Sequence, residues 1–170
     1  QQWIDARESE LLPVPYFHVV FTLPQELNAL ALHKPKEVYD ALFIAAWATL
    51  KSFSGQNKSG MISILHTWGQ NLSLHPHLHC IVPGGSIDKN GKWIIAKSKG
   101  KFLFPVMAMS QVFRAKYVAC LRQSVSIDKE LSAGLFRKQW VVYAKRAFGS
   151  PQSVVEYLGR YTHKIAISNH

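Results

Sequence analysis

The distribution of hydrophobic residues along the chain predicts short strands and longer helices. Runs rich in aromatic and β-branched residues that end at proline, glycine or a polar residue are typical of strands. Segments that begin with Pro, or with a Ser–Pro pair, and continue with mixed polar and apolar residues are typical of helices. The predicted strands are residues 16–23, 61–68, 76–82, 93–96 and 139–144. The predicted helices are residues 24–32, 35–53, 107–122 and 150–161.

The order of these elements predicts an α+β fold. A strand and two helices are followed by several strands, a helix, a strand and a last helix. This order favours a central antiparallel sheet flanked by helices. Residues 69–75 make a connection short enough for an antiparallel hairpin between the second and third strands. Residues 83–85 (PGG) and 88–91 (DKNG) indicate turns.

The chain is long enough for one domain with a substantial core. Its 170 residues suit a single domain of ordinary size. We expect residues 1–13 to form a polar helical lead-in and residues 14–170 to form the domain itself. Because the sequence starts without Met and stops abruptly after AISNH, we expect it to be an excerpt of a longer protein.

Composition narrows the function classes. Apolar residues make up 48% of the chain, which argues against disorder, and the longest apolar stretch, residues 41–50, is too short to span a bilayer. Lys and Arg outnumber Asp and Glu by 20 to 10, so a nucleic-acid partner is favoured over a membrane. An unspecialised basic surface is the alternative. Cys80 and Cys120 form no CxxC motif and suit a reducing compartment. The first residues are polar and charged and do not resemble a signal peptide. Together with the cysteine usage, this predicts a cytoplasmic protein.

The segment HPHLHCIV contains a candidate metal-binding site. Alternate residues on a strand share a face, so His77 and His79 should point one way while Leu78 and Cys80 point into the core. Neutral imidazole is the commonest side-chain metal ligand, and two imidazoles on a rigid strand make a two-point grip. An HxH pair alone also fits packed or surface histidines. Cys80 is better interpreted as a small buried hydrophobe than as a ligand.

Several residues compete to be the third ligand. His66 lies on the preceding strand, just before the turn, and with His77 and His79 would make a three-ligand site with open positions. Gln70, within the turn, is the runner-up, and His75 is a further candidate. A core histidine bonded to backbone is the other interpretation of His66.

The segment EYLGRYTHK contains a candidate nucleophile pair. Tyr157 and Tyr161 are four residues apart, so on a helix both hydroxyls lie on one face. A phenol with a pKa of about 10 is a poor nucleophile at neutral pH. A nearby cation or metal can lower that pKa or neutralise the attacked phosphate, and tyrosines do form covalent intermediates. The alternative is an ordinary amphipathic helix face.

Basic residues near these motifs are candidates for DNA phosphate contacts. Alternating lysines after the fourth strand would share one face of an extended segment, although a plain solvated edge is the alternative. Further basic residues flank the tyrosine pair. The candidates are Lys97, Lys99, Lys101, Lys145, Arg146, Arg160 and Lys164. A basic chain, an HxH strand and a paired-tyrosine helix together suit a metal-assisted phosphodiester transferase.

Three motifs carry a family resemblance. The segments YFHVVFTLP, LHTWGQNLSLHPHLHCIVPGG and YLGRYTHKIAISN closely resemble the two-tyrosine HUH transposases of rolling-circle insertion sequences. HUH denotes histidine, bulky hydrophobe, histidine, here residues 77–79, and the tyrosine motif is Tyr157-x-x-x-Tyr161. The resemblance runs from about Leu11 to the last residue, with the motifs in the family's order. The cysteine-rich segment usually found upstream is absent, and the family continues beyond AISNH, so DNA-end recognition is expected to be incomplete.

The resemblance implies a fold and a chemistry. The fold should be the HUH endonuclease fold, in which a central antiparallel sheet is flanked by helices. The histidine pair and one further polar residue should hold Mg²⁺ or Mn²⁺. A tyrosine should attack single-stranded DNA at a transposon end or target, leaving a 5′-phosphotyrosine link and a free 3′-OH. The second tyrosine would permit a second strand transfer, and no ATP is needed. A bacterial, nucleoid-associated location follows from this use.

Two rival functions remain open. A zinc hydrolase could use His66, His77 and His79 with bound water as nucleophile. That interpretation leaves the tyrosine pair and the positive charge without a role. A non-catalytic DNA-binding relic, held to DNA by charge alone, is the second rival. Such a relic would bind DNA equally well with and without metal.

Overall fold

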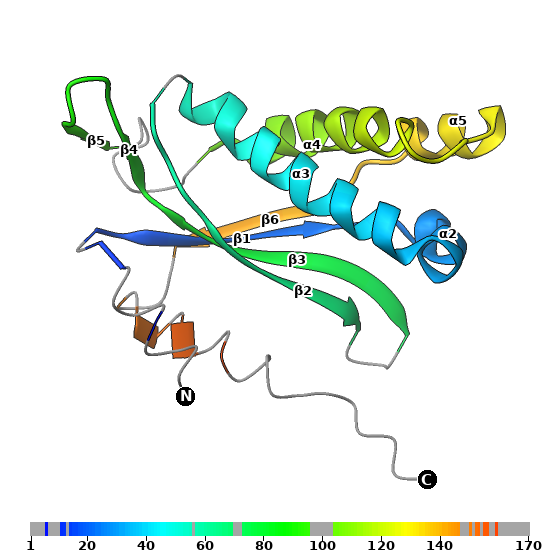
Figure 1. Cartoon of the computed structure of the whole chain (residues 1–170), viewed down its shortest axis with the longest axis horizontal. Coiled ribbons are helices and arrows are strands. Elements are labelled where there is room, and N and C mark those ends of the chain that lie inside the picture. Colours follow the sequence, from blue (N-terminus) through cyan, green and yellow to red (C-terminus); the bar gives the residue numbers. More distant parts are fainter. Residues whose placement is uncertain are drawn as a thin grey trace, which may run out of the picture.

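A four-stranded antiparallel sheet forms the centre of the fold (Figure 1). The computed structural model describes residues 6, 11–12, 14–55, 57–69, 73–95, 104–146, 150, 152–153, 155–156 and 159. The strands in spatial order are β2 (Ile62–Trp68), β3 (Leu74–Pro83), β1 (Tyr16–Thr22) and β6 (Val142–Arg146). A separate two-stranded sheet pairs β4 (Gly85–Ile87) with β5 (Trp93–Ile95) directly after β3.

The long helices lie together on one side of the sheet (Figure 1). The helical elements are the 3-10 turn η1 (Gln25–Leu27), α2 (Asn28–His33), α3 (Pro35–Ser54), α4 (Val106–Leu121) and α5 (Lys129–Arg137). Proline at the first position of α3 loses no hydrogen bond there, and Gly55, with φ of 68°, ends the helix in a conformation that favours glycine. The Asp128 side chain caps α5 by accepting from the Leu131 N–H at 2.7 Å.

The sheet face under these helices packs against them to form the hydrophobic core. We call it the helix face. Its residues on β1 and β3 are Phe17, Val19, Phe21, Leu78, Cys80 and Val82, and all are almost completely buried. The Phe21 ring, for example, packs on Phe113 of α4 at a centroid distance of 4.8 Å. Because strand side chains alternate, the residues between them point to the opposite side of the sheet.

The structure confirms the α+β fold class with its antiparallel sheet flanked by helices. Five predicted strands and the first three predicted helical segments are present, most with ends within two residues of the prediction. The predicted hairpin is also present, since β2 and β3 pair in antiparallel register. The last predicted helix is considered below. The predicted lead-in at 1–13 falls mostly outside the described residues. None of the described helices combines the length and the apolar character needed to cross a membrane.

One strand begins later than its hydrophobic pattern predicts, and two elements have no predicted counterpart. Strand β6 starts at Val142 rather than at residue 139, because Trp140 is buried with its Nε1 donating to the Leu135 carbonyl at 2.9 Å. Strand β4 includes Gly85, which had indicated a turn. A Cβ at Gly85 would lie 2.4 Å from the Ile94 carbonyl oxygen, so this glycine permits close strand pairing. Helix α5 was missed because Leu135 is its one fully buried residue.

Candidate metal centre

The register of the central sheet gathers the histidines on the face away from the long helices. His66 of β2 lies directly opposite His77 of β3, and Ile64 lies opposite His79. Directly opposed residues share a face, and so do alternate residues along a strand. This defines the histidine face, whose residues are Ile62, Ile64, His66, His77, His79, Ile81, Tyr16, His18, Val20, Thr22, Tyr143 and Lys145.

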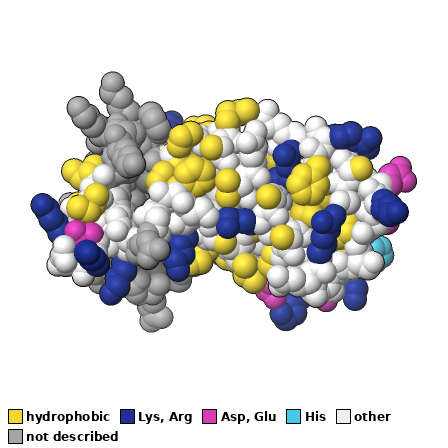
Figure 2. Space-filling model, turned by 90° about the horizontal axis from the view of Figure 1, so that it is seen from above, with side chains coloured by type: hydrophobic (Ala, Val, Ile, Leu, Met, Phe, Trp, Pro, Cys, Tyr) yellow, Lys and Arg dark blue, Asp and Glu magenta, His cyan; other side chains and the backbone are white. Residues whose placement is uncertain are grey.

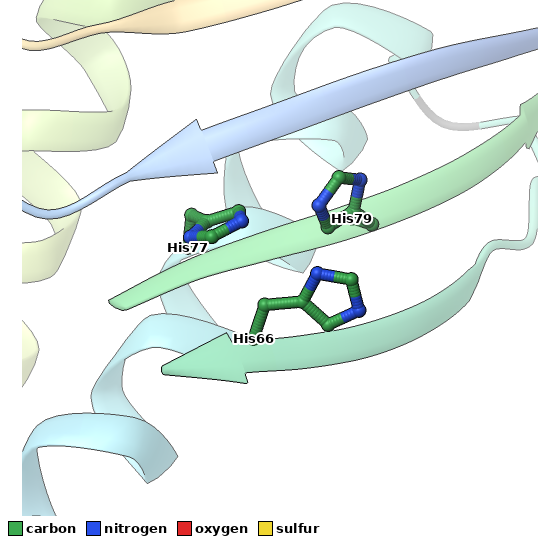
Figure 3. Close-up of side chains that lie close together, drawn as sticks. All are labelled: His66, His77 and His79. Atoms are coloured by element: carbon green, nitrogen blue, oxygen red, sulfur yellow. The ribbon is translucent and has the colours of Figure 1, made fainter. Parts of the chain in front are cut away.

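Three of these histidines converge on one point. The potential ligand nitrogens of His66, His77 and His79 all lie within 4.8 Å of one another. The ring centroids are separated by 4.3 Å for His66–His79, 5.0 Å for His77–His79 and 5.3 Å for His66–His77. Figure 3 shows one ring nitrogen of each residue directed into the space between the rings. The predicted convergence of His77, His79 and His66 is therefore present in the structure.

The Nδ1 atoms of His77 and His79 each make a hydrogen bond on the side of the ring away from that space. The Nδ1 of His77 lies 2.5 Å from the His75 carbonyl oxygen, which can only accept, so Nδ1 carries the proton and the Nε2 lone pair is free to bind. The Nδ1 of His79 lies 2.8 Å from the Nε2 of His18. His75 thus supports the site through its backbone, and its exposed ring is not one of the convergent trio.

The cluster keeps its imidazoles neutral. Burial, and to a lesser degree the charges of the neighbouring histidines, lowers the pKa of His79 to about 3 and that of His66 to about 4. Burial is also the main cause of a lowered pKa at His77. Cys80 points the other way, into the core, where burial raises the pKa of its thiol. A neutral imidazole is the form that binds metal, so near neutral pH these three residues need release no proton.

This donor set fits a divalent cation. Three neutral imidazoles presented from one rigid hairpin leave the remaining coordination positions open, as catalytic metal sites require. His66 and His77 are partly exposed whereas His79 is 8% exposed, so the site has a buried base and an accessible rim. Of the candidates for a third ligand, His66 converges with His77 and His79. Gln70 lies outside the described residues.

Sequence analysis assigned no role to His18, which is a fourth histidine of the same face. It is buried on β1, and its Nε2 contacts His79. The local signal was the alternation Tyr16, His18, Val20, which puts a histidine on the face opposite Phe17 and Val19. The pairing of β1 with β3 was needed to bring it to His79, and that register spans 61 positions of sequence.

Strand β6 lies at one edge of the sheet and completes the histidine face there. Its Tyr143 lies opposite Val20, which in turn lies opposite His79, so these three residues make one row across the sheet. Lys145 is in the next row, opposite His18. The Tyr143 side chain is 50% exposed, and Lys145 is exposed as well. An aromatic ring and a cation are therefore accessible beside the histidine cluster.

Most of the predicted nucleophiles and DNA contacts fall outside the part of the chain that the structure describes. The residues concerned are Tyr157, Tyr161, Lys97, Lys99, Lys101, Arg160 and Lys164. Arg146 is placed by its backbone as the last residue of β6, and its side chain is not described. Lys145 is the one predicted DNA contact whose side chain is described.

The start of the predicted tyrosine helix is described. Ser150 accepts from the Ser153 N–H at 3.2 Å, which is an N-cap hydrogen bond, and the described positions at 152–153, 155–156 and 159 are helical. Val155 is completely buried in a small cluster with Tyr16 and Ile81 of the histidine face. This short helical stretch, orange in Figure 1, lies on the side of the sheet away from α3 and α4.

Comparison with known proteins identifies relatives among transposases. Residues 60–170 match the family model Y2_Tnp, described as "Putative transposase". The "Putative transposase y4qJ" of Sinorhizobium fredii is 40% identical over 99% of this chain and 48% of its own length. The transposase of insertion sequence element IS801 from Pseudomonas savastanoi pv. phaseolicola is 28% identical over 98% of this chain and 43% of its own length. The chain thus spans about half the length of these relatives.

Solved structures with a partial likeness are relaxases. The metal-bound conjugative relaxase TrwC in complex with oriT DNA has a TM-score of 0.48 and 15% identity, covering 66% of this chain and 46% of the relaxase. TrwC with a 27-mer DNA that contains the recognition hairpin and cleavage site has a TM-score of 0.47 and 14% identity, covering 85% and 54%.

Proposed function

Because this chain belongs to the Y2_Tnp transposase family, we propose that it is the DNA-cleaving and DNA-joining domain of a transposase. The observation that carries the proposal is the convergence of three neutral imidazoles on an accessible sheet face. The substrate is single-stranded DNA at transposon ends and targets. The reaction exchanges phosphodiester bonds and so needs no ATP.

His66, His77 and His79 would hold one divalent ion, Mg²⁺ or Mn²⁺. When bound, such an ion supplies a Lewis acid that neutralises charge on the scissile phosphate. The residues of the chain itself orient the donor nitrogens. The His75 carbonyl sets the proton of His77, and burial at the base keeps His79 neutral, so the donor nitrogens are arranged before any ion arrives.

Tyr157 and Tyr161 are the proposed nucleophiles. In the proposed step, a phenol oxygen loses its proton and bonds to phosphorus, while the bond from phosphorus to the 3′-oxygen breaks and that oxygen takes up a proton. The products are a 5′-phosphotyrosine and a free 3′-OH, and attack by a 3′-OH reverses the step. The supporting observation is the position of this helix, whose Val155 is buried against Tyr16 and Ile81 of the histidine face.

The DNA strand is proposed to cross the histidine face beside β6. Lys145 can neutralise a phosphate, and the half-exposed ring of Tyr143 offers a surface on which a base can stack. Lys97, Lys99, Lys101, Arg146, Arg160 and Lys164 are proposed as further phosphate contacts. The chain's net charge of +10 supports this assignment.

One experiment tests the reaction directly. The chain is incubated with labelled single-stranded oligonucleotides from the ends of its element, with and without Mn²⁺ or Mg²⁺, and separated on a denaturing gel. We expect a metal-dependent protein–DNA adduct that the double change Tyr157→Phe, Tyr161→Phe abolishes. Tyr39→Phe, on α3 at the opposite side of the sheet, is the matched control and should leave the adduct unchanged.

The same gel separates the alternatives. The all-nitrogen donor set suits Zn²⁺, and this is the observation behind a hydrolase using bound water. A hydrolase would cleave in the double Phe variant without any adduct. A DNA-binding relic would retain the oligonucleotide equally with and without metal, and would leave it uncut.

A further inference from the structure

The contact between His18 and His79 is a buried hydrogen bond between ring nitrogens, and its direction depends on the tautomers of the two rings. Their ring planes are 15° apart and the ring centroids are separated by 5.0 Å. The N···N distance is 2.8 Å, so the centroid separation is accounted for by that bond and the two ring radii. The rings therefore meet edge to edge in nearly one plane, which is the geometry of a straight N–H···N bond.

The bond has a consequence for the other nitrogen of His79. A neutral imidazole carries one proton, and the nitrogen without it is the one that can bind metal. His79 places Nδ1 against His18 and presents its other edge to His66 and His77 (Figure 3). Nε2 is available as a ligand only when the proton is on Nδ1, in which case Nδ1 donates to the Nε2 of His18.

We propose that His18 is a positioning residue that holds His79 in the Nδ1–H tautomer and in the ring orientation that directs Nε2 into the three-histidine cluster. The role of the cluster as a metal centre and the Nδ1–H tautomer of His79 both rest on the proposed function, because the hydrogen bond alone can run in either direction. A buried bond of this kind locks a ligand ring against rotation, and loss of such support typically weakens metal binding by about 10–100-fold.

The support is unusual in being neutral. Metal-bound histidines more often donate to a carboxylate or a backbone carbonyl, and a carboxylate would add a negative charge behind the ligand. Within the described part of the chain, Lys145, His66 and His77 are among the groups that lower the pKa of His18 or His79. An imidazole acceptor therefore orients His79 without adding a negative charge to the site, so the ion retains more of its positive charge for an anionic phosphate.

Two variants and one control test the proposal. His18→Phe keeps a ring of similar size and removes the acceptor, whereas His18→Gln places a side-chain oxygen near the position of Nε2 and restores it. His33→Phe removes an exposed histidine of α2 and serves as the control. Nitrogen-15 NMR of the metal-free chain reports the tautomer of His79, and the loss of the free Mn²⁺ EPR signal reports metal affinity.

We expect the Nδ1–H tautomer of His79 in the unchanged chain and in His18→Gln, and a mixture of tautomers in His18→Phe. Mn²⁺ affinity should fall about 10–100-fold in His18→Phe and return to within a few-fold in His18→Gln. An Nε2–H tautomer in the unchanged chain, or equal Mn²⁺ affinity in His18→Phe, overturns the proposal. If the unchanged chain bound no divalent ion, the proposed function would fail while the NMR result still decided the role of His18.

Discussion

The two faces of the central sheet are built from the same strands but have different roles, one in stability and the other in the proposed chemistry. On the helix face, Phe17, Val19, Phe21 and Leu78 are at most 1% exposed and pack against the long helices. On the histidine face, four histidines lie among aliphatic residues. Hydrogen bonds join His79 to His18 and His77 to the backbone. Burial of apolar area provides stability on one side, and incompletely covered nitrogen atoms provide chemistry on the other.

The surfaces differ in the same way. The view onto the helix side in Figure 2 shows Lys and Arg scattered among hydrophobic side chains, with histidine only at its margin. On the other side, four histidines lie in three consecutive cross-strand rows, which contain the His66–His77 pair, His79 and His18. A one-residue shift of β3 would exchange its two sets of side chains, burying imidazoles and exposing leucine. Register is therefore as important to the proposed chemistry as it is to stability.

The strongest test compares neighbours on β3. Leu78→Ala should lower the free energy of unfolding by about 2–5 kcal/mol, because it leaves a cavity in the core. His77→Ala should change it by less than about 1 kcal/mol, since this ring is partly exposed, yet it should abolish tight Mn²⁺ binding. Chemical denaturation and Mn²⁺ titration of both variants provide the measurement. Similar stability losses for the two would contradict a division of roles between the faces.

A second test uses pH. His66 and His79 face His77 and His18 and take up protons in the folded, metal-free chain only near pH 4 and 3, whereas in the unfolded chain they do so near their ordinary pKa. Acidification below about pH 6.5 therefore favours unfolding, by at most about 1.4 kcal/mol per pH unit for each histidine and less where solvent screens the charge.

The measurement is the melting temperature between pH 7 and 5. We expect it to fall with pH in the metal-free chain, and to fall less steeply in His66→Gln. His33→Gln, which changes an exposed histidine of α2, should retain the original slope. A melting temperature independent of pH across this range would mean that the cluster does not resist protonation.

A smaller effect is expected at Tyr143. Removing the half-exposed ring in Tyr143→Ala should weaken binding of single-stranded DNA by about 1 kcal/mol, the lower end for loss of one stacked base. Tyr143→Phe keeps the aromatic surface and should bind normally. Fluorescence anisotropy with a short labelled oligonucleotide measures both. Equal affinity for the Ala and Phe variants would place the DNA elsewhere.

The smallest effect concerns Lys145. Lys145→Ala should weaken DNA binding a few-fold, independently of base sequence, and should reduce the salt dependence of log K by about one unit. Lys51→Ala, an exposed lysine of α3 on the helix side, is the matched control and should change neither quantity. An equal effect of the two changes would indicate that the whole basic surface, rather than the histidine face, attracts DNA.

The histidine cluster was predictable because its signals are local. The alternation of β3 separates His77 and His79 from Leu78, and a short hairpin connection brings His66 beside them. The support from His18 was not predictable, because the pairing of β1 with β3 is set by the packing of the whole core. Helix α5 and strand β4 were missed for a different reason, since a single buried leucine and a paired glycine give little pattern to detect. The placement of the tyrosine pair stays a prediction.

The hairpin also has a consequence for the order in which the chain folds. Local contacts close quickly during folding, whereas contacts between distant positions wait for more of the chain to be arranged. The three converging histidines lie on one hairpin, while the bond from His18 joins residues 61 positions apart. A refolding chain should thus form a weak three-histidine metal site early. The orientation of the His79 ring should become fixed only when β1 pairs with β3. Metal affinity measured during refolding should accordingly rise in two phases, with the later one absent in His18→Phe.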